Sequence, residues 1–183
     1  GTSVTGSGDH PLSEPEIDAL VRAIRARPNV CGYNAMHTSG GVLLRTSGLD
    51  PNGVIPKLDE WVWEQLGRRG TELTGYPMHT GLDFTWDLTD PMSGCADDWA
   101  YEHLGIYGWT TEFWDVVHAA TGEKVSTKVW YIGPTDDQAL AVLHWLDAQP
   151  GGPETAGFVD WYEFDHPQLG RVELGGWNEL YSW

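Results

Sequence analysis

Two ionisable residues follow or end apolar segments, which is where α/β proteins place their chemistry. His37 comes directly after a strand-like stretch, 29–36, and before a Thr-Ser-Gly-Gly run that leaves the backbone open. This setting suits a metal ligand or a base that needs close approach by a substrate, and the alternative is a hydrogen-bonded loop histidine. Glu112 lies between large apolar side chains, and burial there would raise its pKa and favour a general base. The alternative for Glu112 is a strand-edge carboxylate that faces solvent.

A third candidate is the acidic pair Asp97 and Asp98, which opens a short predicted helix over 97–104. Acids in the first turn of a helix are stabilised by the helix dipole, so at least one of them is expected to have this capping role. The other is then available to face a pocket. The sequence has no HExxH, phosphate-binding loop, dinucleotide fingerprint or GxSxG motif, so it gives no support to the enzyme classes that those motifs define.

The apolar patterns around these residues predict helices that alternate with short strands. One helix is expected to begin at a capping box of Ser13 and Glu16, and a second to cover 58–66 and end at Gly67 and Gly70. A third is expected over 97–104, and a fourth from a capping box of Thr135 and Gln138 to residue 149. Strands are expected at 29–36, 42–44, 107–113 and 125–132, with a β-like segment at 158–183 and a long loop at 71–91. This alternation predicts a single α/β domain over residues 1–183.

Composition narrows the choice of partners. The 183 residues include 10 Lys+Arg and 27 Asp+Glu, giving a formal net charge of −17, which argues against nucleic acid and anionic membranes as partners. No apolar run approaches the 18 residues or more that a membrane-spanning helix needs. Cys31 and Cys95 lack zinc-type spacing and are expected to be two buried thiols, with a single disulfide as the alternative. The 11 tryptophans suit either a packed core and cleft or a carbohydrate-binding surface.

Several segments taken together resemble one family of enzymes. These segments are Leu-Ser-Glu-Pro-Glu at 12–16, Met-His-Thr-Ser-Gly-Gly-Val-Leu-Leu at 36–44, Gly-Cys-Ala-Asp-Asp-Trp-Ala-Tyr at 94–101 and Thr-Glu-Phe at 111–113. In order and spacing, from about residue 8 to residue 115, they resemble the carboxypeptidase A-like zinc metallopeptidases. The resemblance implies a mixed, mainly parallel sheet with helices on both faces, lacking its N-terminal part in this chain.

The resemblance also implies roles for individual residues. His37 matches a zinc ligand, and Glu112 matches the general base that takes a proton from zinc-bound water and passes it to the leaving amine. Thr38 and Ser39 match positions that line the substrate cleft. Asp97 matches the acid that pairs with a basic C-terminal side chain of a peptide substrate. The implied function is the zinc-dependent removal of C-terminal amino acids from peptides.

The chain departs from the family pattern on the N-terminal side of His37. It has no His-x-x-Glu for the other two zinc ligands, no match to the substrate-binding arginines, and no tyrosine just before Ser93. We therefore expect a C-terminal piece of a longer catalytic domain that binds zinc weakly, is inactive alone and can self-associate through its incomplete sheet. The acidity favours an extracellular or periplasmic location. Two alternatives stay open: an amide hydrolase of the same fold acting on acylated amino acids or cell-wall peptides, and a non-catalytic module that binds peptide or glycan.

Overall fold

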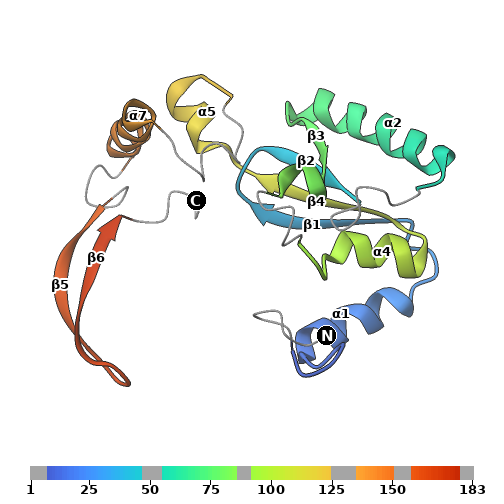
Figure 1. The fold of residues 1–183 in the computed structure, drawn as a ribbon, viewed down its shortest axis with the longest axis horizontal. Coiled ribbons are helices and arrows are strands. Elements are labelled where there is room, and N and C mark those ends of the chain that lie inside the picture. The colour runs from blue at the N-terminus through green and yellow to red at the C-terminus, as the bar shows by residue number, and fades with distance from the viewer. Residues whose placement is uncertain (1–7, 47–54, 86–91, 125–134, 151–157, 178–183) are drawn as a thin grey trace.

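The main sheet has four strands in the order β1-β4-β2-β3 (Figure 1). The computed structural model describes residues 8–46, 55–85, 92–124, 135–150 and 158–177. The strands are β1 (Gly32–Thr38), β2 (Val42–Arg45), β3 (Met78–Thr80) and β4 (Tyr107–Phe113). β1 is parallel to β4 and β2 is parallel to β3, whereas β2 and β4 are antiparallel. The expected mixed, mainly parallel sheet is therefore confirmed.

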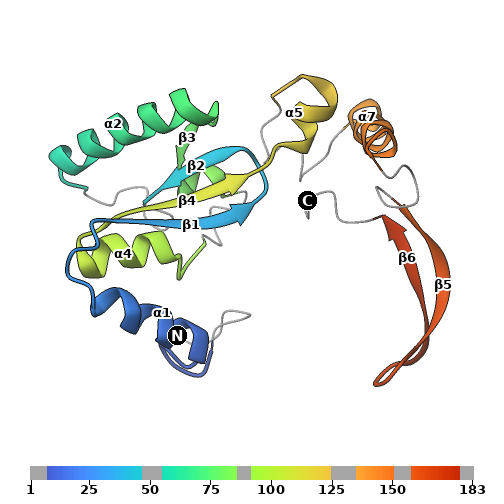
Figure 2. The same ribbon diagram turned by 180° about the vertical axis from the view of Figure 1, so that it is seen from behind.

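Helices cover both faces of this sheet. α2 (Lys57–Thr74) lies on one side, and α4 (Ala96–Leu104) lies on the other, with α1 (Pro15–Arg25) beyond α4 (Figures 1 and 2). Within the described ranges β1 pairs with β4 alone, so its other edge has no strand beside it. The expected self-association through that edge stays a prediction, as does the single-domain assignment.

The prediction that the second helix ends at Gly67 is wrong, because α2 continues for another two turns. A Cβ atom on Gly67 would overlap the Met78 side chain, and one on Gly70 would lie 2.5 Å from Leu43 Cδ1. The two glycines therefore allow the helix backbone to approach β2 and β3. Close packing against the sheet, rather than a stop signal, explains their presence within the helix.

The helix starts agree only in part with the sequence patterns. Ser13 was expected to cap α1, but the N-cap is Glu14, which makes no side-chain cap bond, and the Ser13 hydroxyl instead donates to Glu14 Oε1 at 2.9 Å. Ser13 stands one residue outside the cap position because the helix begins at Pro15. The capping box of Thr135 and Gln138 is confirmed at the start of α7 (Asp136–Asp147).

The loop expected at 71–91 is wrong over its first part. The end of α2, strand β3 and the short helix α3 (Gly81–Phe84) occupy it as far as residue 84. Thr80 caps α3 through a reciprocal bond with Asp83, a local pattern that the turn-rich composition concealed. The strand expected at 125–132 lies outside the described residues.

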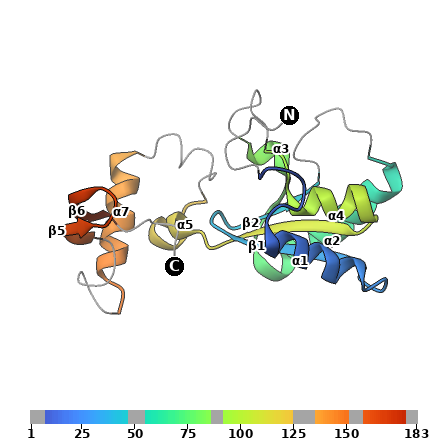
Figure 3. The same ribbon diagram turned by 90° about the horizontal axis from the view of Figure 1, so that it is seen from below.

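The C-terminal elements lie away from the main sheet (Figure 3). α5 (Val116–Thr121), which the sequence patterns did not predict, shares a small core with α7, formed by Val116, Val117, Val142 and Leu146. β5 (Phe158–His166) and β6 (Gly170–Trp177) form an antiparallel hairpin, so the β-like prediction is confirmed as far as residue 177. Among the described residues, no helix is long and apolar enough to span a bilayer.

Candidate active site

The pairing of β1 with β4 brings the two candidate catalytic residues together. His37 stands opposite Glu112 in the parallel register. The pair of Ala35 and Thr110 lies two residues earlier along the same strands and therefore on the same face. Alternate residues of a strand point to the same side, so all four side chains border the face that α4 covers. His37 Nδ1 lies 3.8 Å from Glu112 Oε1, which is an ion-pair separation beyond hydrogen-bond range.

The two partners differ in their exposure to water. The Glu112 side chain is only 10% exposed, whereas the His37 side chain is 60% exposed. Burial raises the pKa of Glu112, and the neighbouring His37 partly opposes this rise. A carboxylate with a raised pKa is a stronger base than an exposed one, so this environment suits proton transfer.

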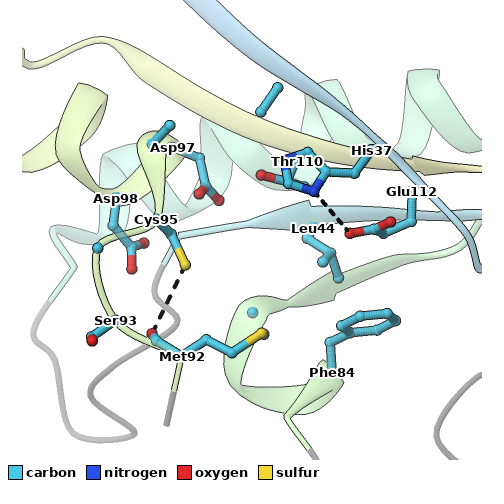
Figure 4. A pocket seen from close by; sticks show the side chains of 14 residues that line it. His37, Leu44, Phe84, Met92, Ser93, Cys95, Asp97, Asp98, Thr110 and Glu112 are labelled. Atoms are coloured by element: carbon cyan, nitrogen blue, oxygen red, sulfur yellow. Dashed lines mark hydrogen bonds and ion pairs between the residues drawn. The ribbon is translucent and has the colours of Figure 1, made fainter. Parts of the chain in front are cut away.

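A cavity of about 370 Å³, here called the central pocket, opens beside this pair (Figure 4). Its walls are mainly apolar and include Ala35, Leu44, Phe84, Met92 and Ala96. In the close view, His37 and Glu112 lie on one side of the pocket, and the acidic pair of α4 lies on the other. The pocket therefore has two polar borders separated by apolar side chains.

Asp97 and Asp98 are both buried in the wall of the central pocket, at 5% and 4% exposure. Burial, followed by the charge of Asp98, raises the pKa of Asp97; bonds from its own backbone N–H, from that of Asp98 and from the Thr110 hydroxyl partly oppose the rise. The expected helix-opening role is thus combined with a position on the pocket. Within the described ranges, no lysine or arginine forms an ion pair with Asp97.

Cys95 also borders the central pocket, next to the acidic pair. Its thiol donates to the Met92 carbonyl oxygen at 3.9 Å. Burial, together with Asp97 and Asp98, raises the pKa of Cys95 to about 11. The neutral thiol is therefore its form at neutral pH, and it lacks the thiolate that a nucleophile needs. Cys95 and Cys31 are both free, but the expectation that both are buried is wrong, because Cys31 is exposed.

Thr38 and Ser39 are not among the residues that line the central pocket. Thr38 ends β1 and borders a separate open depression together with Met36, His37 and Phe113. Ser39 is buried in the turn that follows. The candidate site thus joins His37, Glu112 and Asp97 at one pocket, whereas Thr38 and Ser39 lie outside its lining.

Sequence reasoning missed several residues that shape the pocket. Ala35 and Thr110 were detectable, because each precedes a candidate residue by two positions and so shares its strand face. Leu44 was placed in an extended segment without a direction. Phe84 and Met92 had no signal, since they belong to turn-rich sequence that only the tertiary fold brings to the site.

The donor atoms at this site are too few for a catalytic zinc ion. Such a site needs three protein ligands and a water molecule. His37 and Glu112 supply one imidazole and one carboxylate, and no group of three or more His, Cys, Asp or Glu residues occurs in the part of the chain that the structure describes. The residues present therefore do not fit zinc without further ligands.

The sequence of most of the chain matches one family of proteins. A family model described as zinc carboxypeptidase matches residues 2–131, which is most of the chain. The chain belongs to the zinc carboxypeptidase family. This family implies zinc in the complete enzyme, and it accounts for the mixed α/β sheet.

Comparison with individual proteins adds little detail. The chain is similar to the crystal structure of thrombin activatable fibrinolysis inhibitor (TAFI), at 21% sequence identity and a TM-score of 0.48. The similarity covers 74% of this chain and 33% of that chain, so this chain spans about a third of the length of the protein that it matches. No curated protein matches the chain in sequence.

Proposed function

We propose that this chain forms part of a metallocarboxypeptidase active site, in which Glu112 is the general base and His37 is one metal ligand. The observation that carries the proposal is the approach of His37 Nδ1 to Glu112 Oε1, at 3.8 Å, beside a pocket of about 370 Å³. Membership of the zinc carboxypeptidase family supports it.

The chemistry assigned to Glu112 is a pair of proton transfers. The carboxylate accepts a proton from the water that attacks the last peptide carbonyl, and then gives that proton to the leaving amine. Burial supports this role, because it raises the pKa of the acceptor. Its position beside the exposed His37 ring leaves the carboxylate next to the candidate metal position.

The central pocket supports one substrate class within this proposal. Its apolar walls suit an aliphatic side chain, and the buried carboxylate of Asp97 suits a terminal cation. We therefore assign to Asp97 the recognition of a C-terminal lysine or arginine. Thr38 and Ser39 remain candidates for contacts at the periphery of the cleft.

The remaining zinc ligands belong, in this proposal, to a polypeptide segment outside this chain. The chain alone then binds zinc weakly and hydrolyses no peptide. A second candidate function follows from the same shortage of ligands. Without a completing segment, the chain would act as a non-catalytic module whose pocket binds peptide ends.

The test uses a longer protein that carries this chain with the missing ligands. We compare the wild type with Glu112→Gln, and with Glu64→Gln as a control on an exposed position of α2. Release of the last residue from synthetic peptides is followed by mass spectrometry. Loss of the general base should lower the rate by about 10²–10⁴-fold, whereas the control should keep the wild-type rate.

Substrate preference is tested separately with Asp97→Ala, using peptides that end in Lys, Arg or Leu. We expect the variant to lose its preference for Lys and Arg over Leu. Retention of that preference would remove Asp97 from the specificity site but leave Glu112 untouched. A wild-type protein that releases no residue from any peptide, yet binds them, would favour the non-catalytic module.

A further inference from the structure

The positions of His37 and Glu112 depend on the chain segments that follow them. β4 ends one residue after Glu112, and Trp114 then adopts a positive φ of 72°. Residues other than glycine seldom adopt a positive φ, so a fixed surrounding structure is needed to hold the Trp114 backbone in this conformation. After His37, the chain turns through Gly40 and Gly41 into β2.

Tyr76 contacts both of these segments. Its hydroxyl oxygen accepts a hydrogen bond from the Trp114 backbone N–H at 3.2 Å. Its ring packs edge-on against Phe113, with centroids 6.5 Å apart. A Cβ atom on Gly41 would lie 3.4 Å from the Tyr76 ring, so the turn after His37 runs directly over that ring.

The two segments are also tied to each other. The Gly40 N–H donates to the Trp114 carbonyl oxygen at 2.8 Å. Tyr76 itself is held on both sides. Its N–H donates to Thr74 Oγ1 at 3.1 Å, and the carbonyl oxygen of the next residue, Pro77, accepts from the N–H of Leu43 at 2.9 Å. Tyr76 is therefore held in place, and the segments that follow β1 and β4 both pack against it.

We propose that Tyr76 is a positioning residue that sets the separation of Glu112 from His37 through Trp114 and the Gly40–Gly41 turn. The inference rests on the proposed function for its catalytic consequence. Its structural basis is independent of any bound metal, because none of the contacts involves either candidate catalytic side chain. Nothing in the sequence patterns pointed to Tyr76.

The first test measures amide hydrogen exchange by NMR in the 183-residue chain. Tyr76→Phe removes the hydroxyl and keeps the ring. Tyr107→Phe is the matched control, since it removes a hydroxyl bonded to Asp59 at 2.9 Å at the opposite end of β4. We expect faster exchange at Gly40 and Trp114, and shifted backbone resonances at His37 and Glu112, in Tyr76→Phe alone. Unchanged exchange at Gly40 in that variant would overturn the proposal.

The second test measures kcat and KM in the longer protein. We expect Tyr76→Phe to lower kcat by about 10- to 100-fold with little change in KM, because a displaced base is less effective while the pocket is intact. Gly41→Ala, whose added Cβ crowds Tyr76 and Asp115, should have the same effect. Tyr107→Phe should keep the wild-type kcat.

Equal kcat values for Tyr76→Phe and Tyr107→Phe would reduce Tyr76 to a purely structural role and overturn the inference. If the wild-type longer protein has no peptidase activity, the proposed function fails on its own. The hydrogen-exchange comparison then still decides whether Tyr76 holds the two strand ends.

Discussion

Helix α4 lies close against strand β4 at Gly108, and replacing this glycine should displace the helix that carries Asp97. A Cβ atom built on Gly108 would lie 2.7 Å from Asp97 Cα and 2.9 Å from the Asp97 carbonyl carbon. Real Cβ atoms do not approach other heavy atoms so closely. The obstacle is backbone, so Gly108→Ala can be accommodated only if α4 moves away from the sheet.

The size of the effect follows from this contact. Overpacking a core costs about 1–3 kcal/mol, and a backbone obstacle places Gly108→Ala at the upper end. For a protein of this length, 1 kcal/mol lowers the Tm by about 2–4 °C. The expected loss is therefore about 6–12 °C. Movement of α4 should also widen the central pocket and withdraw Asp97 from it.

Thermal unfolding followed by circular dichroism measures this effect directly. Gly32→Ala is the matched control. Gly32 pairs with Tyr107 on the neighbouring strand, and an added Cβ atom there meets nothing within 4 Å. We expect the control to melt at the wild-type temperature or slightly above it, because alanine restricts the unfolded chain. If Gly108→Ala melts with the control, the close packing of α4 on β4 is refuted.

Three further outcomes follow from the buried groups. Asp97→Asn should stabilise the chain at pH 7. The pKa of Asp97 is raised in the folded state, so the wild-type chain loses stability as the pH rises through that pKa and the carboxyl group ionises. The amide of the variant stays neutral and avoids this loss. The advantage of the variant should disappear below about pH 3.9, as unfolding in denaturant at several pH values would show. Trp63→Phe should cost about 1–3 kcal/mol in the same assay, because the Gly108 carbonyl oxygen loses the indole N–H that donates to it at 3.3 Å. Mass spectrometry after brief thiol alkylation at pH 8 should find Cys31 modified well before Cys95, whose raised pKa keeps it a neutral thiol.

The sequence patterns placed the candidate residues His37 and Glu112 near the ends of two predicted strands, and the family resemblance then selected them from several ionisable residues. His37 directly follows one predicted strand and Glu112 lies near the end of another, and the ends of parallel strands meet at one edge of a sheet. The register of β1 and β4 then joins them as neighbours. Strand alternation would also have added Ala35 and Thr110, since that pattern is local and needs no knowledge of the fold.

The length of α2 and the remaining pocket residues depend on contacts between distant segments. Gly67 and Gly70 were predicted to end a helix because glycine is unfavourable within helices. Packing against Met78 and Leu43 overrides that preference. Phe84 reaches the pocket only because a capped turn of helix follows β3, and no periodic pattern marks so short an element.

The most direct test of the account is the zinc content of two proteins, measured by elemental analysis after dialysis. We expect about one zinc ion per molecule in the longer protein, loss of that ion in its His37→Ala variant, and far less than one ion in the 183-residue chain. One tightly held zinc ion in the isolated chain, or full retention of zinc after His37→Ala, would contradict the claim that His37 contributes one ligand to a metal site that other residues complete.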